Sequence, residues 1–148
     1  YIYQFNKKLL KDFESNFENY SKYNSEFIFV NKIELFPMEI IIKIHQETNN
    51  EVFENIKITN FYDELNFFHS VKKIKIKPKQ NNKVYYVIYK LSSLIKDKEL
   101  KNIWLDSILH NFQLKKSNYF SKCTAISNVD SLKDFMKNID KAFDKETK

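Results

Sequence analysis

The sequence predicts an α+β domain with an N-terminal helix, an antiparallel or mixed sheet of about four to five strands, and two C-terminal amphipathic helices. Three patterns predict it: an apolar period of four near the start, alternating apolar residues in the middle, and helical apolar stripes after residue 98. A helix, then strands, then helices is the order typical of the α+β class. The 148 residues suit one domain, 1–148, and the first residue, Tyr1, suggests a piece of a longer protein.

Residues 3–20 are predicted to form the first helix. Phe5, Leu9, Phe13 and Phe17 recur at a spacing of four, so they share one face of a helix. Charged side chains occupy the other faces: Lys7, Lys8, Lys11, Glu14 and Glu18. Residues 21–25 have the polar composition of a connector.

Residues 27–45 are predicted to form the main strand pair. Apolar residues alternate before Pro37, and after it they alternate with the opposite parity, which indicates two strand segments joined at a kink. The β-branched and aromatic content also favours strands. The inward positions of the second segment are Ile40, Ile42 and Ile44.

Further strands are predicted at 52–59, 71–77 and 83–91, the last being apolar on both faces. Residues 60–70 are ambiguous, because Phe61, Leu65 and Phe68 also fit a short helix.

The two C-terminal helices have the clearest helical patterns. The first, 98–116, has an apolar face that includes Leu100, Trp104 and Ile108. The second begins near Ser131, where Ser131 and Asp134 resemble a capping box. Its apolar stripe consists of Leu132, Phe135, Met136, Ile139, Ala142 and Phe143.

Composition excludes several classes of function. Glycine is absent, which rules out glycine-rich phosphate loops and requires turns with positive φ to use Asn, Asp or Lys. His45, His69 and His110 match no metal-binding spacing, and Cys123 is expected to be a buried thiol in a reducing compartment. We therefore expect no enzyme, metal or cofactor.

No apolar run is long enough to span a bilayer, and no signal peptide is visible.

The net charge is +6, and all the positive charge comes from lysine. The codon bias of an AT-rich genome would enrich lysine, so the charge is most simply explained as solvated surface charge. Lysines around Tyr85, Tyr86 and Tyr89 could bind single-stranded nucleic acid, but these tyrosines are more simply explained as sheet residues packed under helices. Nucleic acid is therefore the least favoured partner.

The last helix allows two interpretations. Its apolar stripe beside Lys133, Lys137 and Lys141 could lie on an anionic bilayer. Alternatively, the stripe packs into the core and the lysines form a solvated back.

Three stretches carry a resemblance to a known family: EFIFVNKIELFPMEIIIKI (26–44), KDKELKNIWLDSILHNFQLK (96–115) and SNVDSLKDFMKNIDKAFD (127–144). In order and spacing they resemble the C-terminal region of the chorein-type bridge-like lipid-transfer proteins, the vacuolar protein sorting thirteen family. The resemblance implies a non-catalytic segment at the end of a lipid groove, which docks on the cytosolic face of organelle membranes at contact sites. The implied partners are phospholipid, the membrane surface and a membrane protein such as a scramblase.

On this interpretation Ile40, Ile42 and Ile44 would line the lipid groove. The membrane contact would be made by Lys133, Phe135, Met136, Lys137, Ile139, Lys141 and Phe143. The alternative is an α+β protein-interaction subunit of a larger assembly.

Overall fold

The computed structural model describes residues 33–124 and 130–144, and these ranges contain six α-helices and no strand. The helices are α3 (Met38–Thr48), α4 (Ile58–Leu65), α5 (Asn81–Ser92), α6 (Lys98–Asn111), α7 (Lys116–Lys122) and α8 (Asp130–Phe143). The predicted α+β class with a sheet of four to five strands is therefore wrong for the part of the chain that the structure describes. The predicted helix 3–20 and the predicted strand residues 27–32 lie outside the described residues.

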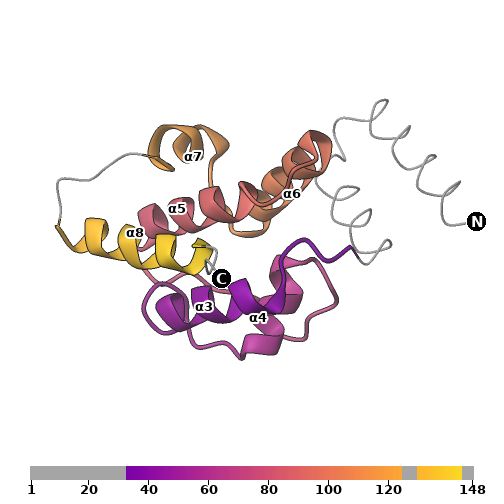
Figure 1. The fold of residues 1–148 in the computed structure, drawn as a ribbon, viewed down its shortest axis with the longest axis horizontal. Coiled ribbons are helices and arrows are strands. Elements are labelled where there is room, and N and C mark those ends of the chain that lie inside the picture. The colour runs from indigo at the N-terminus through magenta and orange to yellow at the C-terminus, as the bar shows by residue number, and fades with distance from the viewer. Residues whose placement is uncertain (1–32, 125–129, 145–148) are drawn as a thin grey trace, which may run out of the picture.

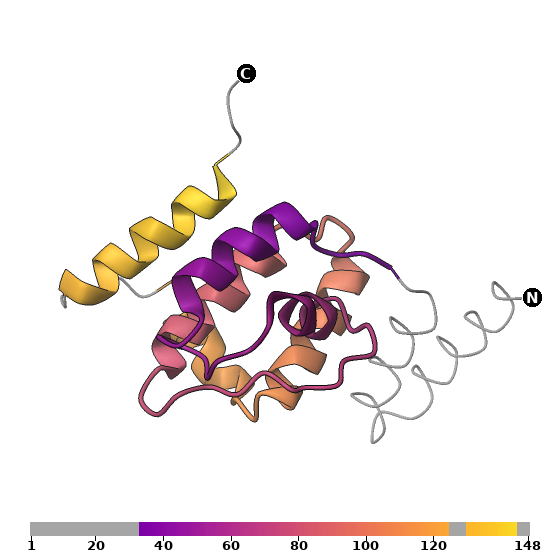
Figure 2. The same ribbon diagram turned by 90° about the horizontal axis from the view of Figure 1, so that it is seen from below.

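Helix α5 occupies the middle of the bundle, in contact with α6, α7 and α8, while α3 contacts α4 and α8 (Figure 1). One hydrophobic core joins these helices, and Trp104 of α6 is fully buried in it. The rings of Trp104 and Phe36 meet edge to face with their centroids 5.1 Å apart. Seen from below, α8 lies along α3 (Figure 2).

The predicted strand 38–45 is helix α3. Ile40, Ile41 and Ile42 are consecutive and Ile44 follows, so this segment satisfies the helical period as well as the alternating one. The structure buries Ile41, Ile44 and Thr48, which lie on one helical face. Pro37 stands just before the first turn, where its missing N–H costs no helical hydrogen bond.

The predicted strand 83–91 is helix α5. Its residues are apolar almost all round because the helix is central, and Val84, Tyr85, Val87, Ile88 and Leu91 are all buried. A short, continuously apolar run cannot be assigned to strand or buried helix by its periodicity alone. The β-branched and aromatic residues that favoured a strand reflect the biased composition of the whole chain.

The predicted strands 52–59 and 71–77 do meet, but only in one isolated antiparallel bridge between Phe53 and Ile76. Two backbone hydrogen bonds flank it, from Glu54 N to Lys75 O and from Lys77 N to Val52 O, each 2.9 Å long. The first of these segments ends early because α4 begins at Ile58.

Helices α6 and α8 confirm that two helices form at the C-terminal end, but α6 ends at Asn111 and not near 116 as predicted. Helix α4 corresponds to the helical alternative that was left open for residues 60–70. The side chain of Asp97 caps α6 by accepting a hydrogen bond from Leu100 N at 2.8 Å. The short helix α7 was not predicted.

Two helices end at residues with positive φ that are not glycine. Phe67 follows α4 with φ 56°, and Gln113 follows α6 with φ 56°. After α6, Gln113 N bonds to His110 O and Leu114 N to Leu109 O, which is the Schellman arrangement usually built on glycine. Asn50 and Lys79 have positive φ in turns, as predicted, whereas Phe67 and Gln113 show that the predicted restriction to Asn, Asp or Lys is wrong.

The side chain of Asn66, fully buried after α4, attaches the segment before α3 to the bundle. Its Oδ1 accepts hydrogen bonds from Leu35 N (2.7 Å) and Phe36 N (2.9 Å), and its Nδ2 donates to Phe36 O (3.2 Å) and Tyr62 O (3.1 Å). Nearby, Trp104 Nε1 donates to Leu65 O at 2.9 Å. The bonds of Asn66 to Leu35 and Phe36 hold the backbone just before α3.

Candidate functional site

A surface groove runs along α3 and the C-terminal half of α8. It consists of two adjacent hollows of about 600 Å³ and 250 Å³, whose linings share Lys43, Gln46 and Ala142. The remaining lining residues are Glu39, Ile40, Ile42, Phe143 and Asp144 in the larger hollow, and Glu47, Asn138 and Lys141 in the smaller one. Figure 2 shows α3 and α8, the two helices that form the walls of the groove, side by side.

The larger hollow exposes apolar surface. Ile42 is 40% exposed although it sits in a helix that packs on the core, and Ile40 and Phe143 are half-buried. The lining thus combines one exposed and two half-buried apolar side chains in a concave surface, and ligand sites are concave and mostly apolar.

Charges of both signs line the groove. Glu39 and Asp144 lie in the larger hollow, Lys43 borders both hollows, and Lys141 and Glu47 lie in the smaller one. A ligand of a single charge sign would meet unfavourable charges at one end, so the lining suits a ligand that carries both.

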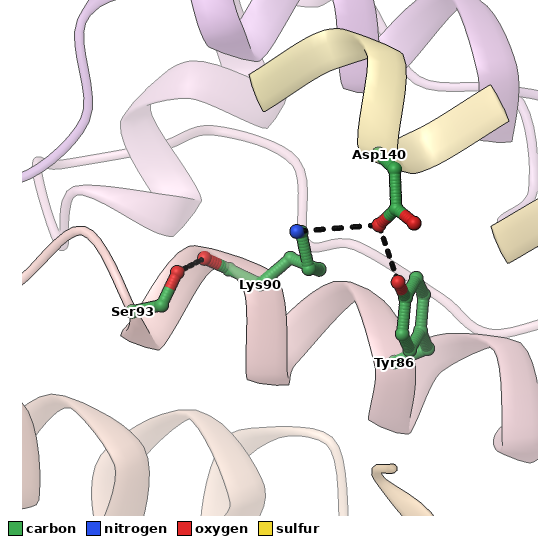
Figure 3. A network of polar contacts seen from close by, with 4 residues as sticks. All are labelled: Tyr86, Lys90, Ser93 and Asp140. Carbon is green, nitrogen blue, oxygen red and sulfur yellow. Dashed lines mark hydrogen bonds and ion pairs between the residues drawn. The ribbon is translucent and has the colours of Figure 1, made fainter. Parts of the chain in front are cut away.

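A polar network on α5 holds the α8 wall in place (Figure 3). The Asp140 carboxylate accepts a hydrogen bond from the Tyr86 hydroxyl and pairs with Lys90 Nζ at 3.2 Å, while Ser93 Oγ donates to Lys90 O at 2.6 Å. Burial, followed by the hydrogen bond to Asp140, raises the pKa of the Tyr86 phenol.

Two cation–π contacts add to this attachment. Lys90 Nζ lies 5.2 Å from the centre of the Phe143 ring, and Lys83 Nζ lies 5.2 Å from that of Phe135. Because Phe143 also lines the groove, the contact with Lys90 holds one apolar part of the groove wall in place.

The structure separates the three residues predicted to line a lipid groove. Ile44 is fully buried, Ile40 is half-buried and Ile42 is exposed. In a strand they would share a face, but successive alternate residues of a helix are rotated by about 200°. Ile40 and Ile42 nevertheless both line the α3–α8 groove.

The predicted membrane-contact residues fall into two sets. Phe135 and Ile139 are buried in the core, with Met136 and Phe143 half-buried beside them. The lysines of the row are exposed: Lys133, Lys137 and Lys141. Of the seven residues only Lys141 and Phe143 line the groove.

Within 33–124 and 130–144, no group of three or more His, Cys, Asp or Glu side chains could hold a metal ion. His45 Nε2 lies 2.6 Å from Ile56 O and its ring packs edge to face on Phe61, which is a structural role. Cys123 is a buried free thiol, as predicted. Among the same residues, no helix combines the length and apolarity needed to cross a bilayer.

Sequence reasoning gave no site role to the other lining residues: Glu39, Lys43, Gln46, Glu47, Asn138, Ala142 and Asp144. The sequence did offer one signal, because residues 38–48 also fit a helix. In that helix Ile41 and Ile44 share the buried face, and Ile42 points away from it.

No family model, no curated protein and no solved structure matches this chain.

Proposed function

We propose that this domain is a protein-interaction module of a larger assembly, and that its α3–α8 groove binds an amphipathic helix of a partner protein. The observation that carries the proposal is the exposed apolar side chain of Ile42, set with Ile40 and Phe143 between charged residues of both signs. An amphipathic helix in a hydrophobic groove is a common mode of peptide recognition.

The length of α3, which forms one wall of the groove, is compatible with a helical ligand. The eleven residues of α3 span about 16 Å, or three turns. A ligand helix lying along this length would present apolar residues at positions i, i+3 or i+4, and i+7 to the groove. Its flanking charged residues would face Glu39 and Lys43.

The experiment is a selection of peptides from a helix-biased display library on the folded chain. We expect enriched peptides with the i, i+3/i+4, i+7 apolar pattern, and loss of their binding to the Ile42→Glu variant. The control is Val71→Glu, because Val71 is 92% exposed and lines neither hollow. Circular dichroism confirms that both variants are folded. Selected peptides that bind Ile42→Glu as well as wild type would overturn the proposal, as would a selection that enriches no such pattern.

A second candidate function is contact with an anionic phospholipid surface, which the family resemblance implies. The exposed row of Lys133, Lys137 and Lys141 on α8 favours it, since each lysine near such a surface contributes about 1 kcal/mol. Co-sedimentation with phosphatidylserine vesicles at low salt is the test. We expect binding that Lys133→Glu/Lys137→Glu abolishes, and wild-type protein that stays in the supernatant would exclude this function.

A further inference from the structure

We propose that the extended segment 73–77, between α4 and α5, is a second docking site, which binds an acidic, extended segment of a partner protein as an added strand. The site is separate from the α3–α8 groove, because no residue of 73–77 lines either hollow. In Figure 2 the connection from α4 to α5 passes outside the connection from α3 to α4, to which the bridge joins it.

The backbone of segment 73–77 has one paired side and one unpaired side. In the bridge to Phe53, the two hydrogen bonds are made by Lys75 O and Lys77 N, so the N–H and C=O of Ile76 itself point away from the partner segment. Peptide groups alternate in direction along an extended chain, so those of Ile74 point the same way. In the part of the chain that the structure describes, these N–H and C=O groups make no backbone hydrogen bond. An unpaired row of this kind is a template for a further strand.

The side chains of the segment define what the added strand carries. Ile74 is buried and Ile76 is half-buried, so the side that faces the core is apolar. Lysines occupy the alternate positions, on the outer side: Lys73, Lys75 and Lys77. Residues 72–79 as a whole contain five lysines and no acidic residue. The segment therefore attracts carboxylates on its outer side and apolar side chains on its inner side.

Acidic residues of the fold meet part of this charge. Lys73 Nζ pairs with Glu64 at 3.0 Å, and Lys75 lies opposite Glu54 across the bridge. Lys77 Nζ donates to a backbone carbonyl oxygen at 2.6 Å, which positions the ammonium group and leaves its charge. Opposite charges that face each other across a strand pair stabilise it. Carboxylates of an added strand, on the unpaired side of Lys75 and Lys77, would do there what Glu54 does on the paired side.

The partner segment therefore alternates acidic and apolar residues. In an antiparallel arrangement, the residue opposite Ile76 exchanges both hydrogen bonds with it and places an apolar side chain on the inner side. The residue opposite Lys75 places its carboxylate on the outer side. In strand addition of this kind, main-chain hydrogen bonds provide the affinity and alternate side chains the specificity.

The first experiment measures binding of the full chain to a short fluorescent peptide of alternating glutamate and valine. Two further peptides carry N-methyl groups, either on the valines or on the glutamates. In the antiparallel arrangement the valine N–H groups point at the segment and the glutamate N–H groups point away. We expect methylation of the valines to weaken binding at least about tenfold, and methylation of the glutamates to change it less than about twofold. Equal effects of the two methylation patterns would overturn the proposal.

The second experiment compares Lys75→Glu with Lys79→Glu, which makes the same change of charge in the exposed turn after the segment. We expect Lys75→Glu to weaken binding about tenfold and Lys79→Glu less than about twofold, because only Lys75 faces the added strand. Ile42→Glu should bind the peptide as wild type does, since the α3–α8 groove takes no part. Circular dichroism confirms that the variants are folded, and the methylated peptides test the wild-type chain independently of them. Equal losses in the two lysine variants, a loss in Ile42→Glu, or no binding to wild type would overturn the proposal.

Discussion

Replacing Asn66 with alanine is expected to lower the free energy of unfolding by about 3 kcal/mol. Asn66 is fully buried and accepts hydrogen bonds from two backbone donors, Leu35 N and Phe36 N. A buried donor that loses its acceptor costs about 1–3 kcal/mol. The hydrogen bond of Phe36 N is buried, so the loss of its acceptor accounts for the larger part of the expected destabilisation. The bond of Leu35 N is only partly buried, so water can partly replace the lost acceptor.

The measurement is urea unfolding followed by the fluorescence of Trp104, the single tryptophan of the chain, which is fully buried against Phe36. The control is Asn102→Ala, because Asn102 is exposed on α6 and its replacement should change stability by no more than about 0.5 kcal/mol. A loss below about 1 kcal/mol for Asn66→Ala, at an unchanged urea dependence, would refute the reasoning that this amide organises the start of α3.

Three further predictions concern α8, the glycine-free helix ends and the tyrosines. Ile139→Asp places a carboxylate at a fully buried position, so a loss of about 3–5 kcal/mol and of helical circular dichroism is expected; if the variant keeps its helix content, the stripe is not core. Gln113→Gly removes the steric cost of a positive φ at the end of α6. Glycine also has an entropic cost, so the net rise in the free energy of unfolding should be about 0.5 kcal/mol. A lower urea midpoint would contradict this prediction. The hydrogen bond to Glu34 raises the pKa of Tyr62 to about 12, and burial with the hydrogen bond to Asp140 raises that of Tyr86. The folded state holds both phenol protons more tightly than the unfolded state, so the two tyrosines contribute stability that is fully present below pH 10. That contribution is lost as pH rises through the folded pKa values. Urea midpoints measured from pH 9 to 12 should fall, and the fall should shrink in Tyr62→Phe/Tyr86→Phe; an equally steep fall in that variant would contradict the assignment.

The parts of the fold that sequence predicted are those where polar residues interrupt the apolar ones. In α6 and α8, lysines and aspartates occupy the outer face, so the apolar residues recur only with the spacing of a helix. In α3 the run of Ile40, Ile41 and Ile42 satisfies both periods, and the central helix α5 has too little polar surface to show either. Burial of those two helices against other elements, rather than their own pattern, decides their structure.

The candidate site could be predicted only in fragments. Ile40 and Ile42 were predicted as inward strand positions that line a lipid groove, and Lys141 and Phe143 as membrane contacts. The groove exists because α8 lies beside α3, and these two helices are separated by more than eighty residues of sequence. A contact of that range has no local signature, so Lys43 and Gln46 gave no signal.

The position of α8 in the chain also determines the order in which the bundle can be completed during synthesis. Helix α8 packs on both α3 and α5, yet it is translated after both of them and after α6 and α7. Until it leaves the ribosome, the surfaces that receive Phe135 and Ile139 are open to water on the nascent chain. Exposed apolar surface on a growing chain is where aggregation begins and where chaperones bind. On the growing chain, the apolar surfaces of α3 and α5 that α8 covers therefore stay open until α8 docks.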